Sequence, residues 1–257
     1  MRARKLLLTC SVAITLLASS ETARAYIIPP SFICRLFSLN RRQMRIDDLS
    51  LELDVTVAAR RTDEADRVLV GHLYLRQPRQ LRLVLSGESD SPAVMIENNG
   101  KRRATPDNPD LALLPSIDPL TTFFAFTHND SEVMSGEMIA LLQSLGIDTQ
   151  EVSLRRWEHD SFIYVIGAKP WDTQAPQAWF LKDAELPLYF RYRAPSLAGG
   201  TELWELHLRN WGSSEAGNWF PGELEYLRNG ESIMSWRVTR AQRNTSLPDT
   251  LFTTLGG

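Results

Sequence analysis

Apolar residues recur at every second position along most of the chain, which predicts strands. In 49–57, LSLELDVTV, every odd-numbered residue is Leu or Val and every residue between them is polar. A period of two is typical of a strand with one buried face and one face in water. Asn99-Gly100 favours a tight turn after the fourth such segment. The predicted strands lie at 49–57, 67–76, 80–87, 93–98, 151–159, 161–168, 176–194 (a hairpin), 201–211, 221–229 and 231–243.

Two segments have helical spacing instead. In 31–44 several apolar residues fall on one face of a helix, with arginines off that face. The segment 131–147 is also expected to be a helix, with Ser131 as its N-cap and Gly146 as its C-cap. Between the strand groups, 105–119 is rich in Pro and Asp, which predicts loop and short helical turns. The helices are therefore few compared with the strands.

Aromatic residues are concentrated in the predicted hairpin. The stretch 176-PQAWFLKDAELPLYFRYRA-194 has two apolar runs around a charged KDAE turn, although aromatic residues make up 9% of the chain. About ten strands carry large apolar side chains on one face, and about three helices are too few to cover them. We therefore predict a mainly β fold: a curved antiparallel sheet that forms an incomplete barrel, with a few helices as a lid over an apolar cavity.

Strand alternation selects the residues that are expected to line this cavity. A register error of one residue would exchange the two faces. Each residue taken singly is as well explained by ordinary core packing, and the group as a whole favours a cavity. Methionines in the lid suit flexible acyl chains, although Met also fills cores. The cavity candidates are Leu53, Val55, Leu73, Leu83, Phe180, Phe190, Trp204 and Trp236. The lid candidates are Met134, Met138, Leu141, Leu142 and Leu145.

The first 25 residues have the pattern of an export leader. A basic start, MRARK, precedes an apolar run at 6–18, and Ala-Arg-Ala at 23–25 fits a cleavage site. The apolar run is shorter than the roughly 20 residues that cross a bilayer. We therefore expect 1–25 to be a cleaved signal peptide, and 26–257 to form a single domain.

Net charge and cysteine content argue against some classes of function. Loss of 1–25 removes four basic residues and one acidic residue, which moves the net charge from −3 to −6. An acidic protein is poorly suited to bind nucleic acid or anionic lipid surfaces through charge. After cleavage one cysteine remains, Cys34, which has no partner for an intramolecular disulfide. We expect it to be buried on a helix face.

The sequence contains no pattern that points to catalysis. The four histidines are scattered, without the spacing of metal ligands. A nucleophile elbow, a P-loop and a dinucleotide-binding glycine motif are all missing. A Ser-His-Asp set that assembles only in space would leave no such trace. We expect no enzymatic activity, no metal and no cofactor.

The order of the segments carries further information. After the leader and the first helix come 47-DDLSLELDVTV-57, then 70-VGHLYLRQPRQLRL-83, an insertion with a helix, and 163-IYVIGA-168. The aromatic hairpin and 244-NTSLPDTLF-252 complete the series. The most specific parts are the run with Pro78, Leu81 and Arg82 and the hairpin itself. Together these segments resemble the LolA/LolB superfamily of periplasmic lipoprotein carriers and lipid-binding lipoprotein-sorting proteins, over nearly all of the chain after the leader.

The resemblance implies an incomplete barrel around an apolar cavity, a bacterial cell-envelope setting and no enzymatic activity. Because Cys34 does not follow a lipobox, the chain looks like the soluble periplasmic carrier. Such a monomer would take the acyl chains of a lipoprotein, or a free lipid, from an inner-membrane transporter to an outer-membrane acceptor. The alternative is an envelope assembly factor or protein-binding module whose concave sheet docks a protein segment without lipid.

Overall fold

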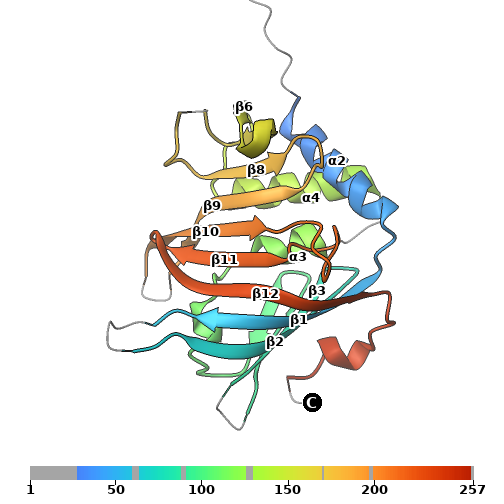
Figure 1. Cartoon of the computed structure of the whole chain (residues 1–257), viewed down its shortest axis with the longest axis vertical. Helices are drawn as coiled ribbons and strands as arrows, with labels where there is room; N and C mark the ends of the chain where they lie inside the picture. The colour runs from blue at the N-terminus through green and yellow to red at the C-terminus, as the bar shows by residue number, and fades with distance from the viewer. Residues whose placement is uncertain are drawn as a thin grey trace, which may run out of the picture.

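One antiparallel sheet organises the chain (Figure 1). The computed structural model describes residues 28–59, 64–87, 91–125, 130–169, 171–196 and 199–255. Within these residues the sheet has twelve strands, in the order β5-β4-β3-β2-β1-β12-β11-β10-β9-β8-β7-β6. The strands are β1 (Asp48–Val57), β2 (Arg67–Arg76), β3 (Gln80–Ser86), β4 (Ala93–Asn98), β5 (Lys101–Ala104), β6 (Val152–Arg156), β7 (Phe162–Ile166), β8 (Gln177–Leu181), β9 (Pro187–Pro195), β10 (Thr201–Arg209), β11 (Glu223–Arg228) and β12 (Glu231–Arg243).

The sheet consists of two meanders that meet at their ends. Strands β1 to β5, the first strand group, pair in chain order. Strands β6 to β12, the second strand group, do the same, and β1 pairs with β12 to join the two groups. Strands β5 and β6 are the edges, so the sheet is not closed into a barrel. The predicted fold class, an incomplete antiparallel barrel with helices, is confirmed. The predicted leader, 1–25, lies outside the described residues.

The period of two in the sequence becomes a division between two faces. In β1 the Leu and Val residues at alternate positions are buried, as the pattern predicts. Leu73 of β2 lies opposite Leu51 of β1 and Leu83 of β3, so apolar side chains stay in register across the strands. We call this the inner face, because the helices lie on it. The opposite, outer face carries the polar residues of the same strands.

Three helices cover the inner face: α2 (Pro30–Gln43), α3 (Pro119–Phe124) and α4 (Ser131–Ser144). In Figure 1, β8 to β11 pass in front of α3 and α4. The side chains confirm that helix and sheet are in contact. The ring centroid of Phe123 in α3 lies 5.0 Å from that of Phe190 in β9 and 5.9 Å from that of Phe180 in β8. The helices therefore fill the hollow of the sheet.

Two expectations about the ends of α4 need correction. The N-cap is Asp130, whose carboxylate accepts a hydrogen bond from the backbone N–H of Glu132 at 2.8 Å, and Ser131 is the first helical residue. The carboxylate also suits the positive end of the helix dipole. The helix ends at Ser144, with Leu145 as its C-cap. Gly146 follows in the left-handed region, at φ 76°, which terminates the helix earlier than the sequence pattern indicated.

The sequence pattern missed two other elements. Strand β5 has the sequence KRRA and lies at an edge, so it has no run of apolar residues to mark it. Helix α3 begins at the last residue of the segment 105–119, which was expected to be loop with short helical turns, and continues through 120–124, for which no element was predicted. Its start is fixed by Asp118, whose Oδ1 accepts from the N–H of Leu120 at 2.9 Å, and by Pro119 in the first turn.

Candidate functional site

The structure brings all eight predicted cavity residues onto the inner face. Each is at most 2% exposed, and all belong to one continuous apolar cluster. Strand register brings the two sheet groups together here, because Val55 of β1 lies opposite Trp236 of β12. The residues are Leu53, Val55, Leu73, Leu83, Phe180, Phe190, Trp204 and Trp236. Their role as ligand contacts stays a prediction.

The predicted lid helix shares this cluster. Met134, Met138, Leu142 and Leu145 are buried, and Leu141 is partly buried against the same cluster. The interior is thus closed by helical side chains that occupy the place proposed for an apolar ligand. The five lid candidates therefore lie in or against the apolar cluster, and their role as a lid stays a prediction.

Aromatic side chains connect the helices with the sheet. Phe37 of α2 lies 5.8 Å from Phe123 and 6.3 Å from Phe124 of α3, measured between ring centroids. It also lies 6.5 Å from Phe180 of β8, in an edge-to-face arrangement. Edge-to-face and tilted ring pairs at these separations stabilise a protein by more than the burial of their surface area alone. This contact is therefore a central point of attachment between the helices and the aromatic hairpin.

Several polar contacts join α4 to α2. The hydroxyl of Ser135 donates to the backbone carbonyl of Ser31 at 2.6 Å. The Ser38 hydroxyl donates to the carbonyl of Cys34 at 2.8 Å, and its oxygen also lies 3.8 Å from the sulfur of Met138. An exposed ion pair, Arg35 with Glu132, adds a contact at 3.4 Å. These interactions make α2 and α4 a helix pair. The pair then rests on the sheet through apolar side chains.

The C-terminal end of α2 is anchored by hydrogen bonds. The Asn40 amide donates to the carbonyl of Ala184 in the β8–β9 turn at 3.1 Å. The guanidinium of Arg41 donates to the carbonyl of Trp219 and lies over the Phe124 ring. Arg41 is fully buried, and this burial lowers the pKa of its guanidinium to about 9. A buried arginine is costly, so its contacts are expected to hold this end of the helix firmly.

Four amphipathic side chains line the inner face of the second strand group. Tyr192, Trp204, Tyr226 and Trp236 come from β9, β10, β11 and β12, and each is at most 2% exposed. Tyr192 lies directly opposite Trp204, and the rings of Tyr226 and Trp236 are 5.3 Å apart. Their polar atoms therefore gather in the interior, away from water.

One buried carboxylate, Asp118, belongs to this polar group. Tyr226 donates its hydroxyl hydrogen to Asp118 Oδ2 at 2.8 Å, while Oδ1 caps α3. Burial raises the pKa of Asp118, and Arg102 and the two hydrogen bonds oppose that rise. Sequence reasoning missed Asp118, Tyr192 and Tyr226. An Asp directly before Pro-Leu was a helix-start signal, but its contact with Tyr226 spans 108 residues.

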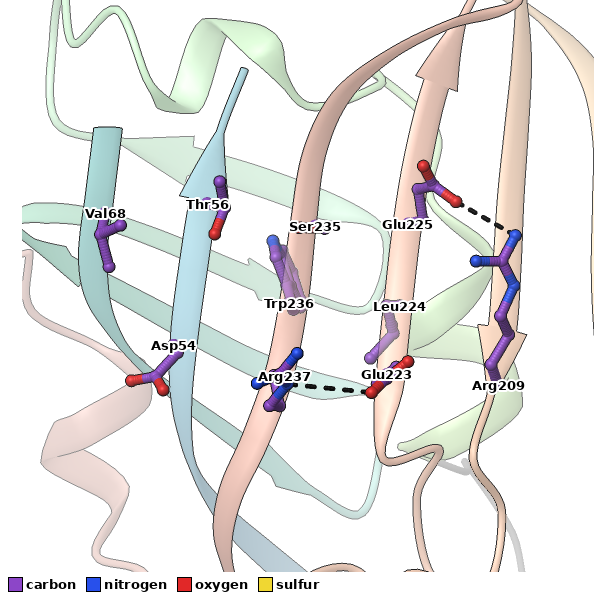
Figure 2. Close-up of a pocket in the computed structure, with 10 residues that line it drawn as sticks. All are labelled: Asp54, Thr56, Val68, Arg209, Glu223, Leu224, Glu225, Ser235, Trp236 and Arg237. Atoms are coloured by element: carbon purple, nitrogen blue, oxygen red, sulfur yellow. Dashed lines mark ion pairs between the residues drawn. The ribbon is translucent and has the colours of Figure 1, made fainter. Parts of the chain in front are cut away.

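The outer face carries a hollow of about 350 Å³ with polar walls (Figure 2). Figure 2 shows side chains of β1, β10, β11 and β12 around it, with ion pairs between Arg209 and Glu225 at 3.1 Å and between Arg237 and Glu223 at 3.8 Å. These charges neutralise one another and face water. The hollow is on the opposite side of the sheet from the apolar interior, and it is unsuited to an acyl chain.

Another charged group lies on the outer face beside the aromatic hairpin. Tyr189 donates to Glu205 at 2.7 Å, and Arg191 pairs with the other oxygen of Glu205 at 3.2 Å. Burial lowers the pKa of the neighbouring His207, and the charge of Arg209 lowers it further. The carboxylate is satisfied by its own neighbours, so this group acts as a structural network across β9 and β10.

The remaining sequence expectations concern cysteine, metals and membranes. Cys34 is buried in α2 as predicted, and burial raises the pKa of its thiol to about 12, so it is a poor nucleophile. Across the described ranges no cluster of three or more His, Cys, Asp or Glu residues could hold a metal ion. The helices in this part of the chain are also too short or too polar to cross a bilayer.

This architecture, an open antiparallel sheet with helices packed into its hollow, is a LolA-like fold. It is similar to the crystal structure of a LolA superfamily protein from Nitrosomonas europaea, with a TM-score of 0.52 over 86% of this chain and 97% of that one, at 11% sequence identity. A DUF1329 family protein from Desulfovibrio piger is more distant, with a TM-score of 0.42, 14% identity, and coverage of 88% and 98%. Neither a protein-family model nor a curated protein sequence matches the chain.

Proposed function

We propose that the protein is a cell-envelope carrier that holds acyl chains against the inner face of its sheet. The main support for this proposal is that helical side chains close the inner face of the sheet through apolar contacts. The helix pair α2–α4 rests on the sheet through apolar side chains, while Ser135 of α4 donates a hydrogen bond to α2 and Glu132 pairs with Arg35 of α2. Apolar contacts are not directional, so an acyl chain can replace them at little cost. The LolA-like fold supports the same reading.

Opening is expected at the end of the helix pair that lies farther from its anchors. Asn40 and Arg41 hold the C-terminal end of α2 to the loops of the sheet. At the other end Ser31 contacts Ser135, and the apolar side chains of Phe32 and Val133 are exposed, at 42% and 43%. We infer that the pair swings about its anchored end and that acyl chains enter at the opposite end.

Mass spectrometry of the intact protein, purified without detergent, tests the carrier proposal. Co-purified species with lipid or lipopeptide masses, released by organic solvent, are the expected result. A ligand-free protein that fails to bind a fluorescent fatty acid would contradict the proposal. If that ligand-free protein instead captured a defined envelope protein segment, the alternative of a protein-binding module would replace it.

Hydrogen exchange tests the motion of α4. Exchange in Ser131–Ser144 should be faster without a fatty acid than with it, while β1 and β9 change little. Gly136 is exposed and has open space around its Cβ position, so Gly136→Ala should stabilise the helix by about 1 kcal/mol and slow its exchange. If α4 exchanged as slowly as β1 in ligand-free protein, it would be ordinary core and the gating mechanism would be wrong.

We also propose that the protein is exported to the periplasm and loses its leader. The expected mature chain begins at Tyr26 and carries no fatty acyl group. Amino-terminal sequencing of the protein from an envelope fraction measures this directly. A chain that began at a lipid-modified Cys10 would instead be a membrane-anchored protein.

A further inference from the structure

The inner face contains hydrogen-bond donors that the protein itself does not satisfy. Among the described residues, the Tyr192 hydroxyl, the Trp204 indole N–H and the Trp236 indole N–H have no hydrogen-bond partner. All three side chains are more than nine-tenths buried. Buried polar groups in native proteins are nearly always paired, because an unpaired one is costly. Three on the inner face of β9, β10 and β12 are therefore unlike a random packing defect.

The position of these donors links them to the proposed ligand. Tyr192 and Trp204 face each other across β9 and β10, and Trp236 lies on β12 beside Tyr226. Helix α3 covers the same region, because its N-cap, Asp118, accepts the hydrogen bond from Tyr226. The hydroxyl of Thr121, also in α3 and buried, has no partner either. Movement of α3 away from this face would expose these polar atoms, with Trp236 two strands and four residues away from Trp204 in the sheet register.

The chemistry of the donors selects the ligand atoms that they can bind. Indole N–H groups donate and cannot accept, so Trp204 and Trp236 require an acceptor. Within an acyl-bearing molecule, the acceptors nearest to the hydrocarbon are the carbonyl oxygens that link each chain to its head. The first strand group offers no comparable set: its inner face at β1 to β3 is formed by Leu, Val and Gly. The acyl tails would therefore lie over that group.

We propose that Trp204, Trp236 and Tyr192 form a binding site for the ester carbonyl oxygens of a diacylglyceryl group. This inference rests on the proposed carrier function and specifies its ligand: an ester-linked lipid, as opposed to a plain hydrocarbon. A free phospholipid and a lipoprotein amino terminus share this diacylglyceryl chemistry.

A pair of lipids that differ only in these oxygens tests the proposal. The probes are dioctanoyl phosphatidylglycerol and its dioctyl-ether analogue, which lacks both carbonyl groups, titrated into the full mature chain by calorimetry. Because each hydrogen bond contributes modestly, the wild type should bind the ester at least about tenfold more tightly than the ether. Trp204→Phe and Trp236→Phe should each reduce this ratio.

Two further variants serve as a substitute test and as a control. Tyr192→Phe removes one oxygen atom with little change in volume, so it keeps the test available if a tryptophan variant fails to fold. Trp171→Phe is the matched control, because Trp171 is 77% exposed and should leave the ratio unchanged. In wild-type protein labelled with ¹⁵N-tryptophan, the indole signals of Trp204 and Trp236 should shift downfield with the ester and not with the ether.

The outcomes separate this inference from the carrier proposal. Equal binding of the two probes, with indole signals that respond alike, would overturn the carbonyl site and leave the carrier standing; internal water would then be the partner of the donors. Failure to bind either probe would overturn both. A synthetic peptide with a diacylglyceryl-modified amino-terminal cysteine, compared with the phospholipid, distinguishes the two sources by their relative affinities.

Discussion

The two strand groups present different inner faces. In β1 to β3 the inward residues are aliphatic, with Leu51, Leu73 and Leu83 in direct cross-strand register. In β8 to β12 they include large aromatic residues, two of which bring indole N–H groups into the interior. An aliphatic surface can only exclude water, whereas the aromatic surface can also orient a ligand. Under the proposed function, the aliphatic side would hold the hydrocarbon of the ligand and the aromatic side its polar linkage.

The largest expected effect comes from a charge on the aliphatic side. Leu83 is fully buried, between Leu73 and Met95. Leu83→Asp should destabilise the protein by about 4 kcal/mol or more, because a carboxylate there has no partner. Urea denaturation followed by circular dichroism measures the change, and Leu83→Met, which conserves volume, should cost less than about 1.5 kcal/mol. A stable Leu83→Asp variant would show that this side is open to water.

On the aromatic side, the next largest effect should come from Phe123. It joins α3 to β8 and β9 through Phe180 and Phe190. Phe123→Ala should lower the free energy of unfolding by about 3–5 kcal/mol. It should also accelerate exchange in α3, since the helix loses its main contact with the sheet. Phe162, at the start of β7 and 39% exposed, provides the control, and Phe162→Ala should change stability much less.

Two tyrosines on the aromatic side should respond with opposite signs. Tyr192→Phe removes a buried hydroxyl without a partner, so it should stabilise ligand-free protein by about 1 kcal/mol or more. Tyr226→Phe removes the donor to Asp118 and should destabilise by about 1–3 kcal/mol. Thermal denaturation of the pair measures both changes. Equal losses in the two variants would mean that the Tyr192 hydroxyl has a partner after all.

The smallest expected effect is a change in pH dependence. Burial raises the pKa of Asp118 above its ordinary value of 3.8, with Glu97 adding to the rise and Arg102 opposing it. The folded state therefore holds this proton more tightly than the unfolded state. The resulting stability is complete below pH 3.8 and is lost as pH rises through the raised pKa.

Asp118→Asn isolates this contribution, because Asn can also cap a helix but does not titrate. Urea midpoints of the variant and the wild type, measured at a series of pH values from about 4 to about 8, should diverge, with the variant gaining relative stability as pH rises. A constant difference would show that Asp118 titrates normally.

The sequence predicted the inner face well and its polar contacts poorly. Alternation in β1, β2 and β3 is unambiguous, because the outward positions are polar, and Leu53, Leu73 and Leu83 were correctly grouped. In β7 to β9 both faces are apolar: Ile163 and Val165 form a second small cluster on the outer face, packed against Trp157 and Trp179. Alternation in the sequence then does not indicate which face is turned inward, and the two faces can be told apart only by their burial in the structure.

The polar site itself depended on contacts that no local pattern encodes. Asp118 reads as one of several acidic residues in a Pro-rich segment, and Tyr226 as one apolar position in a short strand. Their hydrogen bond forms only when the insertion with α3 folds back onto the sheet. Likewise, unpaired donors are a property of the packed interior, so Trp204 and Trp236 could be identified from sequence as inward-facing residues but not as donors without acceptors.

The pairing of β1 with β12 decides when this protein can fold. Asp48, at the start of β1, accepts hydrogen bonds from the backbone N–H groups of Thr245 and Ser246 at 2.7 and 2.9 Å, so residues 197 and 198 positions apart in the chain are joined. A chain still being synthesised has neither β12 nor this contact, and β1 has an unpaired edge until both exist. Because long-range pairing is slow, folding must follow completion of the chain. If the protein is exported as proposed, such a polypeptide would stay unfolded long enough to be threaded across a membrane and would acquire its interior only after release on the far side.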